Sequence, residues 1–440
     1  MTIARNFDGA TANHLKAVLL VKRLHRRAKR RLDQAQEREK RRERRAARRF
    51  RPSTRRARRV RKPINDLHRE YGETYFKRAF RMTHPVFEKL FKMLEPSLVA
   101  VMNKTGPQAV NGSIPLESRL GAALRYFAGG AAYDIAVIFG ISPSSVYESV
   151  NFVIEAINRT PEFNIDFPAD HEEQGRIALE FKKNSVAGID CCTGCADGLL
   201  IWMSKPTLKD CKTCGIGCTK FHCSRKGKYG LNMQAVCDAN NRFLAVSIQY
   251  GGSSSDLLAF EASELRLQLE EEGFLAPGLC IFGDNAYVNT HYMATPYPNV
   301  QGDMERDSYN FYHSQLRIKI ECTFGILIHR WGILSKRMSR RFTVGKTVAL
   351  VTALCKLHNF LIDSEEGHSA SSLAIDRLNM EDEGAIPAGR LMHVGHHTDD
   401  WSERELKVSE RYGDDELPRE AIREHVLEQG LSRPTRQTKN

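Results

Sequence analysis

The spacing of apolar residues divides the chain into a helical part and a part that mixes strands with helices. From about residue 64 to about residue 158, apolar side chains recur at helical spacings, beginning with Phe76, Phe80, Val86, Phe87 and Leu90. After about residue 180 the runs become short and strand-like: SVAGID, LLIWMS, YGLNMQAVCD, RFLAVSIQY and GLCIFGD. The helical run DLLAFEASELRLQLEEE separates the last two strands, and two further helices follow. The pattern therefore predicts an α/β or α+β domain with a mixed sheet, preceded by a small helical domain.

The end of the helical part has the layout of a helix-turn-helix. A helix, a Gly-Gly break and a second helix lead to a turn over 140–143, where Ser142 is a suitable N-cap and proline takes the first helical position. The third helix would present Ser144, Ser145 and Tyr147 to a DNA groove. However, PSSVYESVNFVIEAI contains no Arg or Lys, so a three-helix bundle without DNA contact is an equal alternative.

Charge is concentrated at the beginning of the chain. The formal net charge is +13, yet residues 22–62 alone contain 22 Lys or Arg against four acids. We expect residues 1–63 to form a disordered basic arm that binds phosphate, directs nuclear import, or both; a solvated tail is the structural alternative. Residues 364–440 are acidic and predict a flexible tail with one helix near 418–429. The helical domain is expected over 64–160 and the α/β domain over 180–363.

Composition narrows the class of protein. The chain has 440 residues, 41% of them hydrophobic, which is enough for a real core. It contains neither a run of about 20 apolar residues nor the pattern of a secretory signal, so we expect an intracellular protein outside the membrane. Eleven cysteines in a reducing compartment indicate free thiols or metal ligation more than disulfides.

Three aspartates of the second domain lie at the ends of predicted elements. Asp284 follows the apolar run LCIFG, at the carboxyl end of a buried strand, where open α/β sheets bind their ligands. Asp197 precedes LLIWMS, although the same segment also contains Asp190. Asp256 follows a Gly-Gly-Ser-Ser-Ser turn and opens a helix, where an N-cap or an acid in the first turn is the ordinary explanation.

A fourth acid, Glu321, lies within a helix. Ile318 and Phe324 are three residues to either side, so Glu321 is expected to face an apolar layer, where a lone carboxylate is costly. Each of the four acids has a structural explanation taken alone. Together they form a candidate site for Mg²⁺, which prefers oxygen ligands and supports two-ion cleavage of phosphodiester bonds.

A second candidate metal site is rich in thiols. Seven cysteines lie between Cys191 and Cys223, and Cys211 and Cys214 have the C-x₂-C spacing of zinc ligands. A structural zinc held by Cys211, Cys214, Cys218 and Cys223 is one interpretation, and a loop with free cysteines is the other.

Several blocks of the chain occur in an order typical of a known family. The blocks of the second domain are ADGLLIWMSKP, SRKGKYGLNMQAVCDANNRFLAVSIQYGGSSSDLLAF, GDNAYVNTHYMATPYPN, NFYHSQLRIKIECTFGILIHRWGIL and ALCKLHNFLID. With the upstream blocks FRMTHPVFEKLFKML and IPLESRLGAALRYFAGGAAYDIAVIFGISPSSVYESV, they resemble PIF/Harbinger-type DDE transposases, including the Harbinger transposase-derived nucleases. The resemblance implies an RNase H-like nuclease domain.

The resemblance also implies roles for the acids. The family's first catalytic Asp is followed by a small residue, an apolar strand and a proline nine positions later, which Asp197 satisfies and Asp190 does not. By the same comparison Asp284 and Glu321 complete the catalytic set, and Asp256 is a further metal ligand. The implied chemistry is Mg²⁺- or Mn²⁺-dependent DNA cleavage and joining of the freed 3′-hydroxyl to target DNA.

Further expectations concern partners. Arg225, Lys226, Arg317 and Lys319 are candidate DNA contacts. The family implies a nuclear protein that acts as an oligomer on DNA, together with a Myb/SANT-like DNA-binding partner. A host-adopted nuclear protein that binds DNA without cleaving it is the alternative function. His358 in KLHNF is interpreted as a packing residue.

Overall fold

The computed structural model describes residues 60–102, 112–364 and 417–434. All of them fall within one compact unit that begins at Val60. The predicted basic arm and most of the predicted acidic tail lie outside the described residues. In order along the chain, the helices before the sheet are α2 (Ile64–Phe80), α3 (His84–Met102), α4 (Leu116–Phe127), α5 (Ala132–Ile138), α6 (Pro143–Arg159), η1 (Pro161–Phe163) and α7 (His171–Asn184).

The three helices α4, α5 and α6 have the predicted helix-turn-helix order. Ser142 caps α6, because its side chain accepts a hydrogen bond from the backbone N–H of Ser145. Val146, Val150 and Val153 give α6 a fully buried stripe that packs against α4 and α3. The part of the chain that is described contains no single helix long and apolar enough to cross a membrane. The bent pair of α5 and α6 reaches the required length and apolar composition only when the two helices are taken together.

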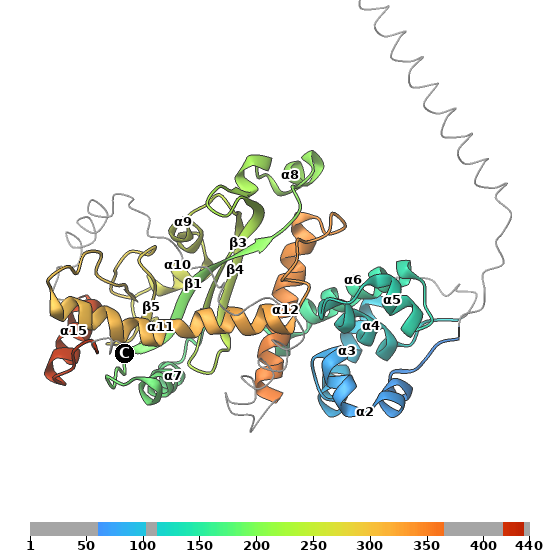
Figure 1. The fold of residues 1–440 in the computed structure, drawn as a ribbon, viewed down its shortest axis with the longest axis horizontal. Coiled ribbons are helices and arrows are strands. Elements are labelled where there is room, and N and C mark those ends of the chain that lie inside the picture. The colour runs from blue at the N-terminus through green and yellow to red at the C-terminus, as the bar shows by residue number, and fades with distance from the viewer. Residues whose placement is uncertain (1–59, 103–111, 365–416, 435–440) are drawn as a thin grey trace, which may run out of the picture. The chain divides into compact units, whose positions relative to one another are not determined.

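A mixed sheet of six strands follows the helices (Figure 1). The strands are β1 (Cys192–Trp202), β2 (His222–Cys223), β3 (Lys228–Cys237), β4 (Phe243–Gly251), β5 (Cys280–Phe282) and β6 (Met293–Ala294). β1 pairs antiparallel with β3 and parallel with β5, while β4 extends the sheet on β3 and β6 extends it on β5. The predicted mixed sheet and RNase H-like fold are therefore confirmed.

Two details of the strand prediction were wrong. SVAGID forms no strand and instead leads through a turn into β1. β1 begins at Cys192, seven residues before the apolar run LLIWMS, so Asp197 lies inside the strand. The physical reason is that Gly194 and Ala196 interrupt the alternation of large apolar residues, while β3 and β5 still pair along this stretch.

Helices cover the sheet. They are α8 (Leu208–Cys214), η2 (Cys218–Phe221), α9 (Asp256–Glu261), α10 (Glu264–Leu269), α11 (Met304–Arg330), α12 (Val344–Ser364) and α15 (Pro418–Glu428). The long helix α11 packs on β1, β3 and β5, and α12 packs on β4 and also on α6 (Figure 1).

The helix predicted near the end of the chain is present, but it is not loosely attached. Ile422 and Val426 of α15 are buried, and α15 packs against α11 and β6. Arg423 also forms an ion pair with Glu305 of α11, with 2.8 Å between nitrogen and oxygen. The predicted flexible tail therefore requires a correction over 417–434, where an apolar stripe docks the helix on the sheet domain.

Candidate active site

Strand register places two aspartates at the same edge of the sheet. Cys195 of β1 is paired with Phe282 of β5 in the parallel ladder. Asp197 and Asp284 each follow two residues later, so they lie side by side where β5 ends and β1 continues. The backbone N–H of Ala286 donates to Asp284 Oδ1 at 2.8 Å and fixes this side chain in the turn after the strand.

Burial gives these two carboxylates unusual electrostatics. The Asp197 side chain is only 14% exposed. Burial, and then the negative charge of Asp284, raise the pKa of Asp197 to about 7. The pKa of Asp284 is also raised by burial, against the hydrogen bond from Ala286 and the positive charge of Arg317. Raised pKa values in two neighbouring buried carboxylates are typical of a functional site, and a cation between them would favour their ionised forms.

Asp256 approaches the same strand from α9. A Cβ atom at position 198 would lie 2.2 Å from Asp256 Oδ1, so Gly198 leaves the space that the carboxylate fills. Because successive side chains of a strand point to opposite faces, Asp256 reaches β1 from the face opposite to the Asp197 side chain. Ser255 is the N-cap of α9, since its Oγ accepts from the backbone of Leu258. Asp256 is therefore an acid in the first turn of α9 and not its N-cap.

An amide network holds Asp256 in place. Asp256 Oδ1 accepts hydrogen bonds from Asn232 Nδ2 at 3.0 Å and from Gln234 Nε2 at 3.1 Å. The hydroxyl of Tyr287 donates to Gln234 Oε1 at 2.6 Å. Asn232 and Gln234 are buried on β3, where unbonded amides would be costly, so the network fixes each group. The sequence analysis missed both amides, although two polar residues at alternate positions in YGLNMQAV signal a polar face in a buried strand.

Glu321 joins the site through Arg317. Arg317 Nη2 donates to Glu321 Oε1 at 2.7 Å, and Arg317 Nη1 lies 3.7 Å from Asp197 Oδ2. The predicted apolar surroundings of Glu321 were wrong: its side chain is 44% exposed, and Ile318 is 49% exposed. The buried face of α11 runs instead through Leu316, Ile320 and Phe324. Glu321 therefore lies at the border of that face, where it can reach both solvent and the aspartates.

The comparison with protein families supports a nuclease class for this domain. Residues 196–359 match the family described as DDE superfamily endonuclease. The match includes Asp197, Asp256, Asp284 and Glu321 and supports a DDE transposase-like nuclease, which would act on DNA. Comparison with curated proteins and with solved structures gives no match.

Asp190 lies outside the DDE endonuclease match and outside the site. It precedes β1, and its side chain is 57% exposed and paired with Lys182 at 2.9 Å. An exposed ion pair of this kind contributes little and needs no further partner. The geometry thus distinguishes Asp197 from Asp190, as the spacing typical of the family also does.

The four candidate DNA contacts lie in different surroundings. Arg225 is exposed in the turn before β3, close enough to Asp284 for its charge to lower the pKa of that carboxyl. Lys226 is half-buried in the same turn, and Lys319 is half-buried on α11. Arg317 is only 17% exposed and is taken up by the carboxylates, so its prediction as a DNA contact needs a correction. An arginine this buried stabilises the negative charge of the acids beside it.

Two histidines of the domain are structural. His358 is fully buried, with Nε2 2.7 Å from the carbonyl oxygen of Asn241, which confirms the packing interpretation. His313 is also fully buried and stacks on Phe282 at 4.6 Å between ring centroids. Burial lowers the pKa of each to about 3, so both rings are neutral at physiological pH.

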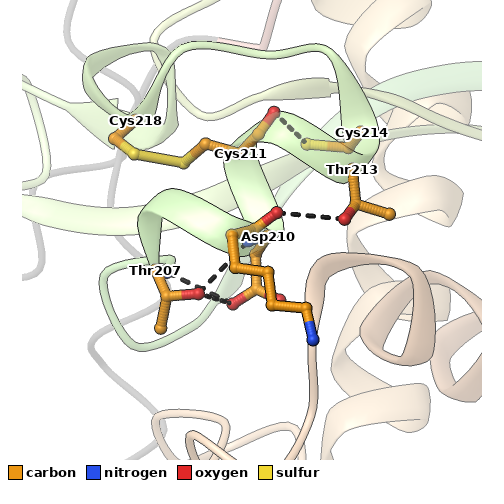
Figure 2. The surroundings of a disulfide bond; sticks show 7 residues. Thr207, Asp210, Cys211, Thr213, Cys214 and Cys218 are labelled. Carbon is orange, nitrogen blue, oxygen red and sulfur yellow. Dashed lines mark hydrogen bonds between the residues drawn. A yellow bond between two sulfur atoms is a disulfide. The ribbon is translucent and has the colours of Figure 1, made fainter. Parts of the chain in front are cut away.

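The thiol-rich segment does not form the predicted zinc site. Figure 2 shows that Cys211 and Cys218 are joined by a disulfide, which removes two of the four expected ligands. Cys214 Sγ instead contacts the carbonyl oxygen of Cys211 at 3.6 Å, and Cys223 is buried on β2. The zinc prediction was wrong because C-x₂-C spacing places thiols near each other without directing four of them to one point.

The carboxylates remain the better donors for a metal. Across residues 60–102, 112–364 and 417–434, no group of three or more His, Cys, Asp or Glu side chains is arranged to hold a metal ion. The chemistry of the donor set nevertheless fits a hard divalent cation, because Asp197 and Asp284 are buried oxygen ligands whose repulsion such an ion would relieve. Arg317 supplies part of that positive charge in the structure.

Proposed function

We propose that this protein is a Harbinger-type DDE transposase or transposase-derived nuclease that cleaves DNA phosphodiester bonds. The observation that carries the proposal is the juxtaposition of Asp197 and Asp284, produced by strand register, inside a segment that matches DDE superfamily endonucleases. Glu321 is linked to the same place through Arg317. A carboxylate site on an RNase H-like sheet supports phosphodiester chemistry more directly than any other reaction class.

In this proposal Asp197, Asp284 and Glu321 hold divalent ions, Mg²⁺ or Mn²⁺. Asp256 reaches β1 from the other face, but its charge raises the pKa of both aspartates, so we include it as a further ligand at the edge of the site. Such ions, when bound, activate the attacking oxygen and stabilise charge on the leaving oxygen. Arg317 keeps Glu321 within reach and limits repulsion at Asp197. Arg225, which is exposed beside Asp284, is suited to orient a DNA phosphate.

The biological setting is part of the same proposal. The ordered blocks of the sequence support the Harbinger subtype, and with it a nuclear location and a Myb/SANT-like DNA-binding partner. Two transposon ends require two catalytic centres, so we propose that the protein works as an oligomer on DNA. Joining of the freed 3′-hydroxyl to target DNA would use the same carboxylates.

A non-cleaving nuclear DNA-binding protein is the second candidate. One observation favours it: Arg317 contacts both Asp197 and Glu321, and so supplies positive charge where a nuclease needs an ion. The presence of all four acids favours the nuclease. The two candidates differ in whether Mg²⁺ binds the carboxylates, which can be measured without activity.

The decisive experiment compares wild type with Asp197→Asn and Asp190→Asn. We expect wild type to nick supercoiled DNA in Mg²⁺ or Mn²⁺, Asp197→Asn to be inactive, and Asp190→Asn to be unchanged. In parallel, Mg²⁺ at about 100 times its Kd should stabilise wild type by about 2.7 kcal/mol and leave Asp197→Asn unaffected. Absence of both nicking and metal stabilisation in wild type would support the non-cleaving protein.

A further inference from the structure

We propose that a basic loop of the nuclease domain and the first turns of α6 together form a binding surface for the backbone of duplex DNA. The basic loop is defined as residues 331–343, which connect α11 to α12. The inference deepens the proposed function, because it rests on DNA as the substrate. It assigns a binding role to residues that the carboxylate site does not use.

Charge is the first observation. The segment 336–346 contains five Lys or Arg, and no acid occurs from residue 322 to residue 362. Lys336, Arg337, Arg340 and Arg341 are all exposed. Among the residues that the structure describes, Lys336, Arg337 and Arg340 have no carboxylate within 4.0 Å, whereas most basic side chains of α7 are paired. Unpaired cations that share one short loop are suited to neutralise phosphates.

The loop is fixed at both ends, in contrast to an ordinary surface loop. The backbone N–H of Met338 donates to the carbonyl oxygen of Trp202 at 3.0 Å, and Ser204 returns a hydrogen bond to Met338. On its other side Ile333 donates to the carbonyl oxygen of Phe127 at 3.1 Å. The loop therefore ties the end of β1 to the end of α4. A cation array held this way loses little conformational entropy on binding.

The loop places positive charge beside the first turns of α6, which contain no Arg or Lys. The guanidinium of Arg341 lies over the ring of Tyr147, 4.4 Å from its centroid. Tyr126 meets the edge of Tyr147 at 5.7 Å and stacks on Phe342 at 6.3 Å. Ser144, in the first turn of α6, is exposed beside this group. The first turns of α6 are thus neighboured by Arg341, from a segment about 200 residues later in the chain.

The surface continues toward the carboxylates. Trp202, which accepts the hydrogen bond of Met338, ends β1 five residues after Asp197, about 17 Å along a strand. Lys228 Nζ lies 4.4 Å from the centroid of the Trp202 ring, so a further cation occupies this path. One turn of B-DNA is about 34 Å long. A duplex with a scissile phosphate at Asp197 can therefore reach the basic loop within one turn.

The test uses the full-length protein, in EDTA so that no cleavage occurs, and duplex DNA as the probe. The triple variant Arg337→Gln, Arg340→Gln, Arg341→Gln should lower the slope of log K against log salt by about 3, close to 0.9 for each lost phosphate contact. Because the basic arm is also expected to bind phosphate, a photoreactive amino acid at Ser339 is used to report on the loop alone. We expect it to crosslink to the duplex, and the yield to fall about tenfold or more in the triple variant.

The matched control removes the same charge elsewhere. Arg176→Gln, Lys182→Gln and Lys183→Gln on α7 remove three cations that are paired with acids, and should change the slope by less than about 1. A photoreactive residue at Leu179, 54% exposed on the same helix, should give only background crosslinking. Equal slopes in the two triple variants, no crosslink from position 339, or stronger crosslinking to RNA than to DNA would each overturn the inference.

The result is separable from the proposed function. Binding in EDTA does not depend on the carboxylates, so Asp197→Asn should crosslink from position 339 as wild type does. Crosslinking without any nicking by wild type would refute the nuclease while retaining the DNA surface. Nicking without crosslinking would refute the DNA surface while retaining the nuclease.

Discussion

Two regions of this domain contain metal-ligating residue types, and they have opposite structures. The carboxylates come from positions spread over more than 120 residues, yet β1, β5 and α11 bring Asp197, Asp284 and Glu321 to one edge of the sheet. The thiols are crowded into the short segment 211–223, yet two of them form a disulfide and Cys214 and Cys223 are free thiols. Closeness in sequence predicted a site less well than the register of distant strands.

Energetics explain the difference. The thiol segment is stabilised by its own residues. Thr207 and Asp210 form a capping box for α8, and the disulfide closes the loop that follows. The carboxylate site does not, since burial raises the pKa of both aspartates and Arg317 only partly compensates. A region left unsatisfied by its own fold is the one that gains from a ligand.

The largest expected effect tests this contrast directly. Asp284→Asn keeps the shape of the side chain but removes a buried charge and a hard oxygen ligand. We expect Mg²⁺-dependent nicking to fall about 10³-fold or more. The matched change in the thiol region, Asp210→Asn, alters a half-buried capping residue outside the carboxylate site and should leave nicking unchanged. A loss of similar size in both variants would mean that the assay reports stability and not chemistry.

A smaller effect is expected in the thiol region. The Cys211–Cys218 disulfide closes a loop with a sequence separation of 7 residues. Removing it with Cys211→Ala and Cys218→Ala should lower the free energy of unfolding by about 2.5 kcal/mol in urea titrations. Cys214→Ala, which removes a free thiol of the same helix, is the control and should cost less. Nicking by the double variant should persist at a temperature where it is folded.

Metal analysis of the same proteins sharpens the comparison. Purified wild type should contain no stoichiometric zinc, with or without reductant. Zinc that is retained in reduced wild type and lost in the double variant would restore the four-thiol site and reverse our conclusion for this region.

The fold was predictable to the extent that local pattern determined it. Alternation and apolar runs located β3, β4 and β5, and the Ser-Pro signal located the start of α6, because these features depend on neighbouring residues. SVAGID was misassigned because a short apolar run does not distinguish a strand from a turn packed against a helix. The start of β1 was missed because its glycine and alanine pair with partners that only the tertiary fold supplies.

The site was predictable in its residue types but not in its geometry. Asp197 and Asp284 stood out as acids at elements of an α/β sheet, and the structure places them together. The surroundings of Glu321 were misjudged because Ile318 and Phe324 lie on different sides of the real helix surface. Arg317 was assigned to DNA because its two carboxylate partners lie four residues away on α11 and on another element, a combination that spacing alone does not reveal.

The smallest expected effect tests how tightly the carboxylate site is packed. In Gly198→Ala the new methyl group would lie 2.2 Å from Asp256 Oδ1 and 2.7 Å from Gln234 Nε2, so the carboxylate and its amide donor must move. We expect a loss of about 1 to 3 kcal/mol in the free energy of unfolding, the usual cost of overpacking. Gly217→Ala in the thiol region is the counterpart, because nothing lies within 4 Å of a Cβ atom there and its φ of −62° suits alanine. Its stability should stay within about 0.5 kcal/mol of wild type. If both substitutions prove equally mild, Asp256 is free to leave Gly198, and the tight packing that distinguishes the carboxylate site from the thiol segment is not a constraint on its function.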